Sequence, residues 1–177
     1  MNKFIAALEV LKNYVGDSKP INDTLRKGTD IPEKDILDGL FVEGEVPHYL
    51  YRLLDISEVD ITGDIIIDPG YLSCSSHFDD FIDSTGKVNH LACYRIEDAS
   101  PINRIIVKEF LPNQNDEGEI ILPRNLPLKI VAIDNYSGAD DFERLLEKVE
   151  CDSTGSKELC YAMGIERITL YTLRVVR

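Results

Sequence analysis

The chain has 177 residues and a formal net charge of −13; 44% of its residues are hydrophobic and 29% are charged. This length fits one domain with a proper core, and the composition argues against wholesale disorder. The negative charge disfavours nonspecific binding to nucleic acid, which requires clustered lysine and arginine, and it suits a partner that presents positive charge. No apolar stretch approaches membrane-spanning length and no secretory signal is recognisable, so we expect a cytoplasmic protein with no membrane association.

The cysteines and histidines show no spacing typical of a metal site. No two cysteines form a Cys-x-x-Cys pair, and the histidines lack paired ligand spacing. We therefore expect reduced thiols and no bound metal. The residues concerned are Cys74, Cys93, Cys151, Cys160, His48, His77 and His90.

Residues 1–42 are predicted to form a helical lobe. Apolar residues recur at helical spacing over 2–15, and a glycine follows as a natural stop. Two shorter helical segments begin near Pro20 and Pro32, because proline is favoured in the first turn of a helix.

Residues 43–177 are predicted to form a β-rich part. Apolar or alternating runs bounded by turn residues indicate strands. An amphipathic pattern over 140–150 indicates a helix, and 156–163 is a further helical candidate. The strand segments are 47–54, 65–67, 71–76, 90–96, 102–110, 126–134 and 168–176. We expect one domain over 1–177, of the α+β class, with helices first and a mainly antiparallel sheet system after them.

An arginine lies inside one of the predicted strands. Arg52 is surrounded by apolar residues of the segment 47–54, and an unpaired guanidinium is costly to remove from water. It therefore needs a carboxylate, a phosphate or backbone carbonyls as a partner. An internal ion pair and a ligand-binding role are both open at this point.

The strand over 71–76 carries two closely spaced serines. Ser73 and Ser75 are expected to share one face, where hydroxyls can hold a neighbouring carboxylate. A polar edge strand is the commoner structure for such a pair. Two aromatic residues, Phe78 and Phe81, follow at a spacing seen more often in a core than against a ligand.

Two carboxylates stand at the start of a later strand. In Glu117-Gly118-Glu119, which runs into an apolar segment, both glutamates project to the same side of an extended chain. Such a pair can divide electrostatic and acid–base work, although a solvated strand edge is the commoner setting. A polar, turn-rich loop over 111–116 leads into it. The same tripeptide occurs at 43–45, but no apolar run follows that copy.

The order of these features resembles the Arg–Ser–Glu class of mono-ADP-ribosyltransferases. The resemblance extends from about residue 20 to the C-terminus. It implies two packed, roughly perpendicular antiparallel β-sheets with NAD, the substrate, in the cleft between them, and no metal. The matching stretches are Ile21-Asn22-Asp23-Thr24-Leu25-Arg26, Tyr51-Arg52, Gly70-Tyr71-Leu72-Ser73-Cys74-Ser75 and Glu117-Gly118-Glu119-Ile120-Ile121-Leu122-Pro123.

The resemblance also implies a role for each residue of a catalytic set of four. Arg52 would bind the phosphates and ribose of NAD, and Ser73 would orient Glu119. Glu119 would hydrogen-bond the nicotinamide ribose and stabilise its positive charge, and Glu117 would receive and help deprotonate the acceptor. The implied NAD contacts are Arg52, Leu53, Ser73, Ser75 and Glu119, together with Phe78 or Phe81, either of which could stack on nicotinamide.

Two positions depart from the family pattern. Cys74 stands where a threonine is usual, but its side chain should point away from Ser73, so catalysis should survive. Leu53 stands where a glycine often follows the arginine, and its backbone can still contact the nicotinamide amide in a tighter pocket.

A glutamate at position 117 goes, in this family, with arginine acceptors. The resemblance therefore implies a transferase that modifies an arginine in a positive patch of a target protein. It would be a toxin or effector of bacterial or phage-encoded kind, acting in a bacterial or host cytoplasm. The same site acting on a nucleic-acid base or small molecule is one alternative, although the net charge weighs against nucleic acid. A non-catalytic NAD-binding or interaction domain is another, which the presence of all four residues disfavours.

Overall fold

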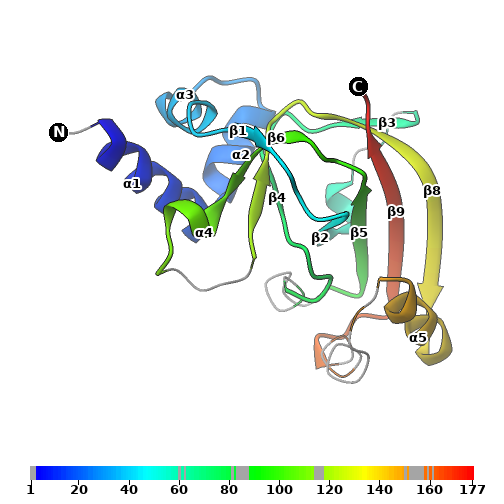
Figure 1. Cartoon of the computed structure of the whole chain (residues 1–177). Helices are drawn as coiled ribbons and strands as arrows, with labels where there is room; N and C mark the ends of the chain where they lie inside the picture. The colour runs from blue at the N-terminus through cyan, green and yellow to red at the C-terminus, as the bar shows by residue number, and fades with distance from the viewer. Residues whose placement is uncertain are drawn as a thin grey trace.

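In the computed structural model, the N-terminal helices lie at one end of the molecule and two β-sheets make up most of the rest (Figure 1). None of the helices in the described ranges has the length and apolar character needed to span a bilayer. Half of the predicted helical segment over 156–163 lies outside these ranges, and its described residues 158, 160 and 162 are helical. The structure describes residues 3–59, 61, 63–80, 82, 88–113, 118–149, 151, 158, 160 and 162–177.

Three helices form the N-terminal lobe, as predicted. They are α1 (Lys3–Gly16), α2 (Lys19–Arg26) and α3 (Pro32–Asp38). Proline stands in the first turn of both α2 and α3, where its missing N–H removes no helical hydrogen bond. Soon after α2 comes Gly28, whose φ of +76° suits a residue without a Cβ atom.

The smaller sheet has four strands in the order β1-β6-β7-β4, and each neighbouring pair is antiparallel. Because β1 begins at Val42 and pairs with β6, the chain enters the sheet at the end of the predicted helical lobe. The strands are β1 (Val42–Gly44), β4 (Leu72–Cys74), β6 (Ile102–Ile106) and β7 (Ile120–Leu122).

The larger sheet has five strands in the order β2-β5-β9-β8-β3. The β5–β9 pair is parallel, an exception within a system that is otherwise antiparallel, as predicted. A parallel pair needs a long crossover, and the chain between these two strands is long enough to provide it. The strands are β2 (Tyr49–Asp55), β3 (Ile65–Ile67), β5 (His90–Glu97), β8 (Pro127–Ser137) and β9 (Arg167–Val175).

Three apolar clusters hold these parts together. The first lies between the two sheets and includes Leu50 of β2 and Leu72 of β4. The second packs the larger sheet against α5 (Ala139–Lys148). The third packs the helical lobe against the smaller sheet and includes Tyr14 of α1 and Ile121 of β7. The predicted α+β class with two packed sheets is therefore confirmed.

One predicted strand is shorter than the sequence pattern indicates. The pattern predicts a strand over 102–110, but β6 ends at Ile106 and a helical turn, α4 (Val107–Phe110), follows. The N–H of Val107 still donates to the carbonyl oxygen of Glu119 at 3.1 Å, so the chain turns away only where the ladder to β7 ends. Apolar residues stand on both sides of the junction at Ile106, so they conceal the change from strand to helical period.

Candidate active site

The two sheets are joined by an isolated bridge between Tyr51 of β2 and Ser75, just after β4. The N–H of Tyr51 donates to the carbonyl of Ser75 at 2.7 Å, and the reverse hydrogen bond measures 2.8 Å. The bridge brings Arg52 beside Ser73, and Nη1 of Arg52 donates to the main-chain carbonyl oxygen of Ser73 at 3.1 Å. Two residues that the sequence marks in separate motifs therefore meet where the sheets cross.

Arg52 is half-buried and lies on the same face of β2 as Leu50 and Leu54, which belong to the core between the sheets. Within the described part of the chain its Nε is buried and has no hydrogen-bond partner. None of the ion pairs formed among the described residues includes Arg52. Among these residues its partner is a backbone carbonyl, which was one of the alternatives open from the sequence.

A cavity of about 900 Å³ opens beside Arg52. Its walls come from α2, from β2 and the short 3₁₀ helix after it (Ile56–Glu58), from β3 with the turn that follows, and from β5. This volume lies in the range of small-molecule and cofactor sites, about 300–1,000 Å³. The lining includes Asn22, Arg26, Arg52, Leu54, Asp68 and Tyr94.

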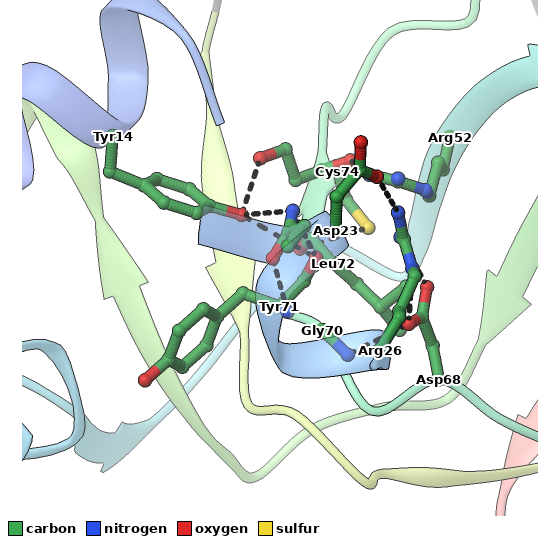
Figure 2. Close-up of polar contacts among 11 residues, drawn as sticks. Tyr14, Asp23, Arg26, Arg52, Asp68, Gly70, Tyr71, Leu72 and Cys74 are labelled. Carbon is green, nitrogen blue, oxygen red and sulfur yellow. Dashed lines mark hydrogen bonds and ion pairs between the residues drawn. The ribbon is translucent and has the colours of Figure 1, made fainter. Parts of the chain in front are cut away.

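A second arginine lines the same cavity. Arg26, at the end of α2, donates from Nε and Nη2 to the two carboxylate oxygens of Asp68 at 2.9 and 2.7 Å (Figure 2). Its Nη1 lies 3.7 Å from a carboxylate oxygen of Asp23. The hydrogen bond to Asp68 is the main cause that raises the pKa of Arg26. Arg26 is thus a charged group held in a fixed orientation at the cavity wall.

Tyr94 of β5 stands directly opposite Arg52 in the strand register and lines the cavity. Burial raises the pKa of its phenol to about 12, so the hydroxyl is protonated near neutral pH and can donate a hydrogen bond. Tyr94 lies in an ordinary apolar strand, and Arg26 and Asp68 are 42 residues apart. For that reason neither Tyr94 nor the ion pair has a sequence signal of its own.

One buried side chain docks α2 onto the start of β4. The Asn22 carboxamide accepts from the N–H of Tyr71 at 2.9 Å and donates to the carbonyl of Tyr71 at 3.3 Å. A Cβ atom on Gly70 would lie 2.8 Å from Oδ1 of Asn22, so glycine is needed for this close approach. Figure 2 shows Tyr14 and Tyr71 on one side of this group, and Arg52 on the other.

The Ser73 side chain faces the helical lobe. Its Oγ lies 3.4 Å from the hydroxyl of Tyr14 of α1. The neighbouring Cys74 is fully buried in the core between the sheets, so the two side chains lie on opposite faces of β4. Burial raises the pKa of the Cys74 thiol to about 12, which makes this cysteine a packing residue with little thiolate character.

Glu119 immediately precedes β7 and is half-buried. Burial is the main cause that raises the pKa of both Tyr14 and Cys74; the charge of Glu119 adds to this effect and the charge of Arg52 opposes it. Both charges are therefore within electrostatic range of the strand that carries Ser73. The structure thus brings Arg52, Ser73 and Glu119 together, whereas Glu117 lies outside the described residues.

Ser75 has a different environment from the strand face expected for it. Its side chain is fully buried, and its hydroxyl donates to Asp80 and accepts from the N–H of His77 at 3.1 Å. Gly118, with a φ of +60°, packs beside it; a Cβ atom there would lie 3.7 Å from Oγ of Ser75. Ser75 therefore links the loop after β4 to the Glu-Gly-Glu segment.

Two other expected NAD contacts lie in the core formed with α5. Phe78 is 1% exposed, and its ring packs edge-on against Tyr51 with centroids 6.1 Å apart. The side chain of Leu53 is buried in the same cluster. Neither side chain lines the cavity beside Arg52, so stacking of the Phe78 ring on nicotinamide stays a prediction. Phe81, the alternative for that contact, lies outside the described residues.

The second Glu-Gly-Glu copy is a solvated strand edge. Glu43 and Glu45 are exposed at β1, and a Cβ atom on Gly44 would lie 2.7 Å from Nη2 of Arg104. Arg104 donates to the carbonyl oxygens of Glu45 at 3.1 Å and Val42 at 3.3 Å. This copy is covered by an arginine that binds backbone, and it does not line the cavity beside Arg52.

No protein-family model and no curated protein sequence matches the chain. Solved structures do match it. Plx2a, an ADP-ribosyltransferase toxin from Paenibacillus larvae, gives a TM-score of 0.65 at 14% identity, over 97% of this chain and 86% of that chain. The Salmonella SpvB ATR domain gives 0.59 at 18% identity, over 97% and 99%. Exoenzyme S from Pseudomonas aeruginosa, in complex with human 14-3-3 protein beta and bound to carba-NAD, gives 0.57 at 15% identity, over 96% and 72%.

These similarities extend over nearly the whole chain at low sequence identity, so they establish its fold. The chain has the fold of bacterial ADP-ribosyltransferase toxins. The fold implied by the Arg52, Ser73 and Glu119 motifs is thereby confirmed.

Proposed function

We propose that this protein transfers ADP-ribose from NAD to a side chain of a target protein and releases nicotinamide. One observation carries the proposal: Nη1 of Arg52 is held by the Ser73 carbonyl, while its buried Nε is unpaired among the described residues, beside a cavity of about 900 Å³. A buried donor without a partner is costly, so such a group in a cavity indicates a ligand. A phosphate oxygen of NAD supplies the missing acceptor.

The cavity suits the phosphate-bearing part of a dinucleotide. Arg52 and Arg26 bring two guanidinium groups to its walls, and guanidinium groups form strong charge-assisted hydrogen bonds to phosphate. Tyr94 adds a neutral hydroxyl donor, and Leu54 and Ile66 add apolar surface against which a ring can pack. The lining therefore offers polar and charged groups for the phosphates together with apolar surface for a ring.

Glu119 would act on the bond that breaks. Cleavage between nicotinamide and ribose builds positive charge on the sugar, and a fixed carboxylate nearby lowers the barrier electrostatically. The effect is larger in a half-buried position than in water, because the surroundings screen the charge less. Ser73 would orient this carboxylate, since β4 and β7 are paired and Ser73 stands opposite Ile121, two residues after Glu119.

Arginine is the acceptor that we infer from the Glu-x-Glu pattern. A protonated arginine is a poor nucleophile, so Glu117 would be needed to help remove its proton. The net charge of −13 would attract a positively charged patch around the target arginine. The same charge favours a protein target over nucleic acid.

Incubation of the purified protein with labelled NAD and a cell lysate tests this proposal. We expect label on target protein, loss of that label with Glu119→Gln, and full labelling with Glu45→Gln, the matched change in the exposed copy of the tripeptide. Label on nucleic acid instead of protein would show that the acceptor is a nucleic-acid base and not a protein side chain. Folded wild-type protein that neither consumes NAD nor transfers label would overturn the proposal.

A further inference from the structure

The hydroxyl of Tyr14 connects the helical lobe to the candidate active site. Tyr14 is fully buried on α1, and its hydroxyl lies 3.1 Å from Nδ2 of Asn22, 3.4 Å from Oγ of Ser73 and 3.4 Å from the carbonyl oxygen of Tyr71. Figure 2 shows the hydroxyl directed at this group, away from the helix that carries it. A buried hydroxyl of this kind sets the direction of the hydrogen bonds around it.

The orientation of the Asn22 carboxamide determines which atom donates in its hydrogen bond with Tyr14. Its Oδ1 accepts from the N–H of Tyr71 at 2.9 Å, so the carboxamide is oriented with Nδ2 toward Tyr14. Nδ2 can only donate, and the Tyr14 oxygen must therefore accept from it. The proton of Tyr14 is left for Ser73 or for the Tyr71 carbonyl. Burial raises the pKa of Tyr14, so this proton stays in place through the neutral range.

We propose that Tyr14 is a positioning residue, whose hydroxyl donates to Oγ of Ser73 and so directs the Ser73 proton toward the carboxylate of Glu119. The inference rests on the proposed function, in which Ser73 orients Glu119. In this proposal the donors run from Asn22 to Tyr14 to Ser73 to Glu119, so that each hydroxyl accepts one hydrogen bond and donates one. The charge of Glu119 is close enough to Tyr14 to raise its pKa further, and the charge of Arg52 opposes this effect.

Tyr71 provides a matched control for Tyr14. The two rings pack edge-to-face with centroids 5.7 Å apart, and both side chains are fully buried. The hydroxyl of Tyr71 donates instead toward α3, at 2.8 Å from Asp38 and 3.1 Å from the carbonyl of Lys34. Removing either hydroxyl thus breaks hydrogen bonds of the lobe, but among these two only the Tyr14 hydroxyl reaches Ser73.

The test measures NAD hydrolysis and thermal melting for wild type, Tyr14→Phe, Tyr71→Phe, Ser73→Ala and the Tyr14→Phe/Ser73→Ala double variant. We expect Tyr14→Phe to lower kcat about tenfold with little change in KM, as loss of one orienting hydrogen bond should. Tyr71→Phe should keep the kcat of the wild type, although its melting temperature should fall about as far as that of Tyr14→Phe. The double variant should be no slower than Ser73→Ala alone, because Tyr14 acts through Ser73.

The outcomes separate this inference from the proposed function. An inactive, folded wild type would overturn the proposed function and the positioning role with it. An active wild type together with an unchanged kcat in Tyr14→Phe would overturn the positioning role alone. Equal losses of kcat in Tyr14→Phe and Tyr71→Phe, or a double variant whose losses multiply, would show that Tyr14 acts only through the stability of the lobe.

Discussion

The guanidinium of Arg52 is tied to the main chain of the neighbouring sheet, where its Nη1 donates to the carbonyl oxygen of Ser73 at 3.1 Å. The adjacent bridge between Tyr51 and Ser75 fixes the separation of the two strands. The orientation of the guanidinium is therefore set by backbone, and none of the ion pairs formed among the described residues includes it. This arrangement leaves a directed positive charge for a ligand in the cavity.

Arg52→Lys should weaken NAD binding by about 10- to 100-fold, the cost of losing charge-assisted hydrogen bonds. A lysine keeps the charge but loses the planar fork, whose fixed donors can hold the Ser73 carbonyl with one nitrogen and point the others at phosphate oxygens. Isothermal titration with NAD measures the effect, in a Glu119→Gln background that prevents turnover. Arg104→Lys is the control, because Arg104 also binds backbone carbonyls but lies at an exposed strand edge. A lower melting temperature with unchanged NAD affinity would mean that Arg52 is only structural.

Gly70→Ala should destabilise the protein by about 1–3 kcal/mol, the usual cost of forcing extra atoms into a packed site. The new Cβ atom would lie 2.8 Å from Oδ1 of Asn22, whose carboxamide holds α2 against β4. Urea unfolding measures the change in the free energy of unfolding. Gly16→Ala is the matched control, since no atom lies within 4 Å of a Cβ atom there and stability should not fall. Equal behaviour of the two variants would contradict the close approach of Asn22.

Much of the fold could be predicted because its signals are local. Proline and glycine bracket the helices of the lobe, and the apolar run of β9 and the amphipathic α5 follow regular periods. The parallel pairing of β5 with β9 has no such signal, since register between distant strands depends on tertiary packing. The turn at α4 was concealed for a similar reason: its apolar residues fit a strand equally well.

The candidate site likewise contains some residues that the sequence reveals and others that it does not. Arg52 and Ser73 stand out from the sequence because a charge in an apolar strand and hydroxyls in a small-residue strand need partners. Tyr94 does not stand out, because a tyrosine in a strand is ordinary and its place opposite Arg52 follows only from the strand register. The interior position of Phe78 depends on how the loop after β4 packs against Tyr51, which local sequence does not determine.

Cys74 should resist alkylation in the folded protein, while Cys151 should react first. Cys74 is fully buried and burial raises the pKa of its thiol to about 12, so almost no reactive thiolate exists at pH 8. Cys151 is only half-buried. Iodoacetamide treatment followed by peptide mass spectrometry measures the order of labelling, with urea-unfolded protein as the reference in which all thiols react. Rapid labelling of Cys74 would indicate a one-residue shift of β4, which would exchange the faces of Ser73 and Cys74.

Substitution of the two glutamates in the segment 117–119 should have different effects on NAD hydrolysis and on ADP-ribose transfer. Glu119→Gln keeps the size of the side chain but removes the charge that offsets the developing sugar cation. NAD hydrolysis and transfer should both fall by about 10²–10³-fold, comparable to removal of other preorganised electrostatic groups. Nicotinamide release, measured with and without the small guanidine agmatine as an acceptor, reports both activities.

Glu117→Gln leaves the Glu119 carboxylate in place and removes only the group assigned to the acceptor. It should abolish transfer to agmatine while much of the slow NAD hydrolysis remains, because water needs less help than a protonated guanidinium. Glu45→Gln should affect neither activity, since the first tripeptide lies at an exposed strand edge. Equal loss of hydrolysis in the Glu117 and Glu119 variants would disprove the division of roles. Retained transfer in the Glu117 variant would remove the basis for an arginine acceptor, and full activity in the Glu119 variant would place the reaction elsewhere in the molecule.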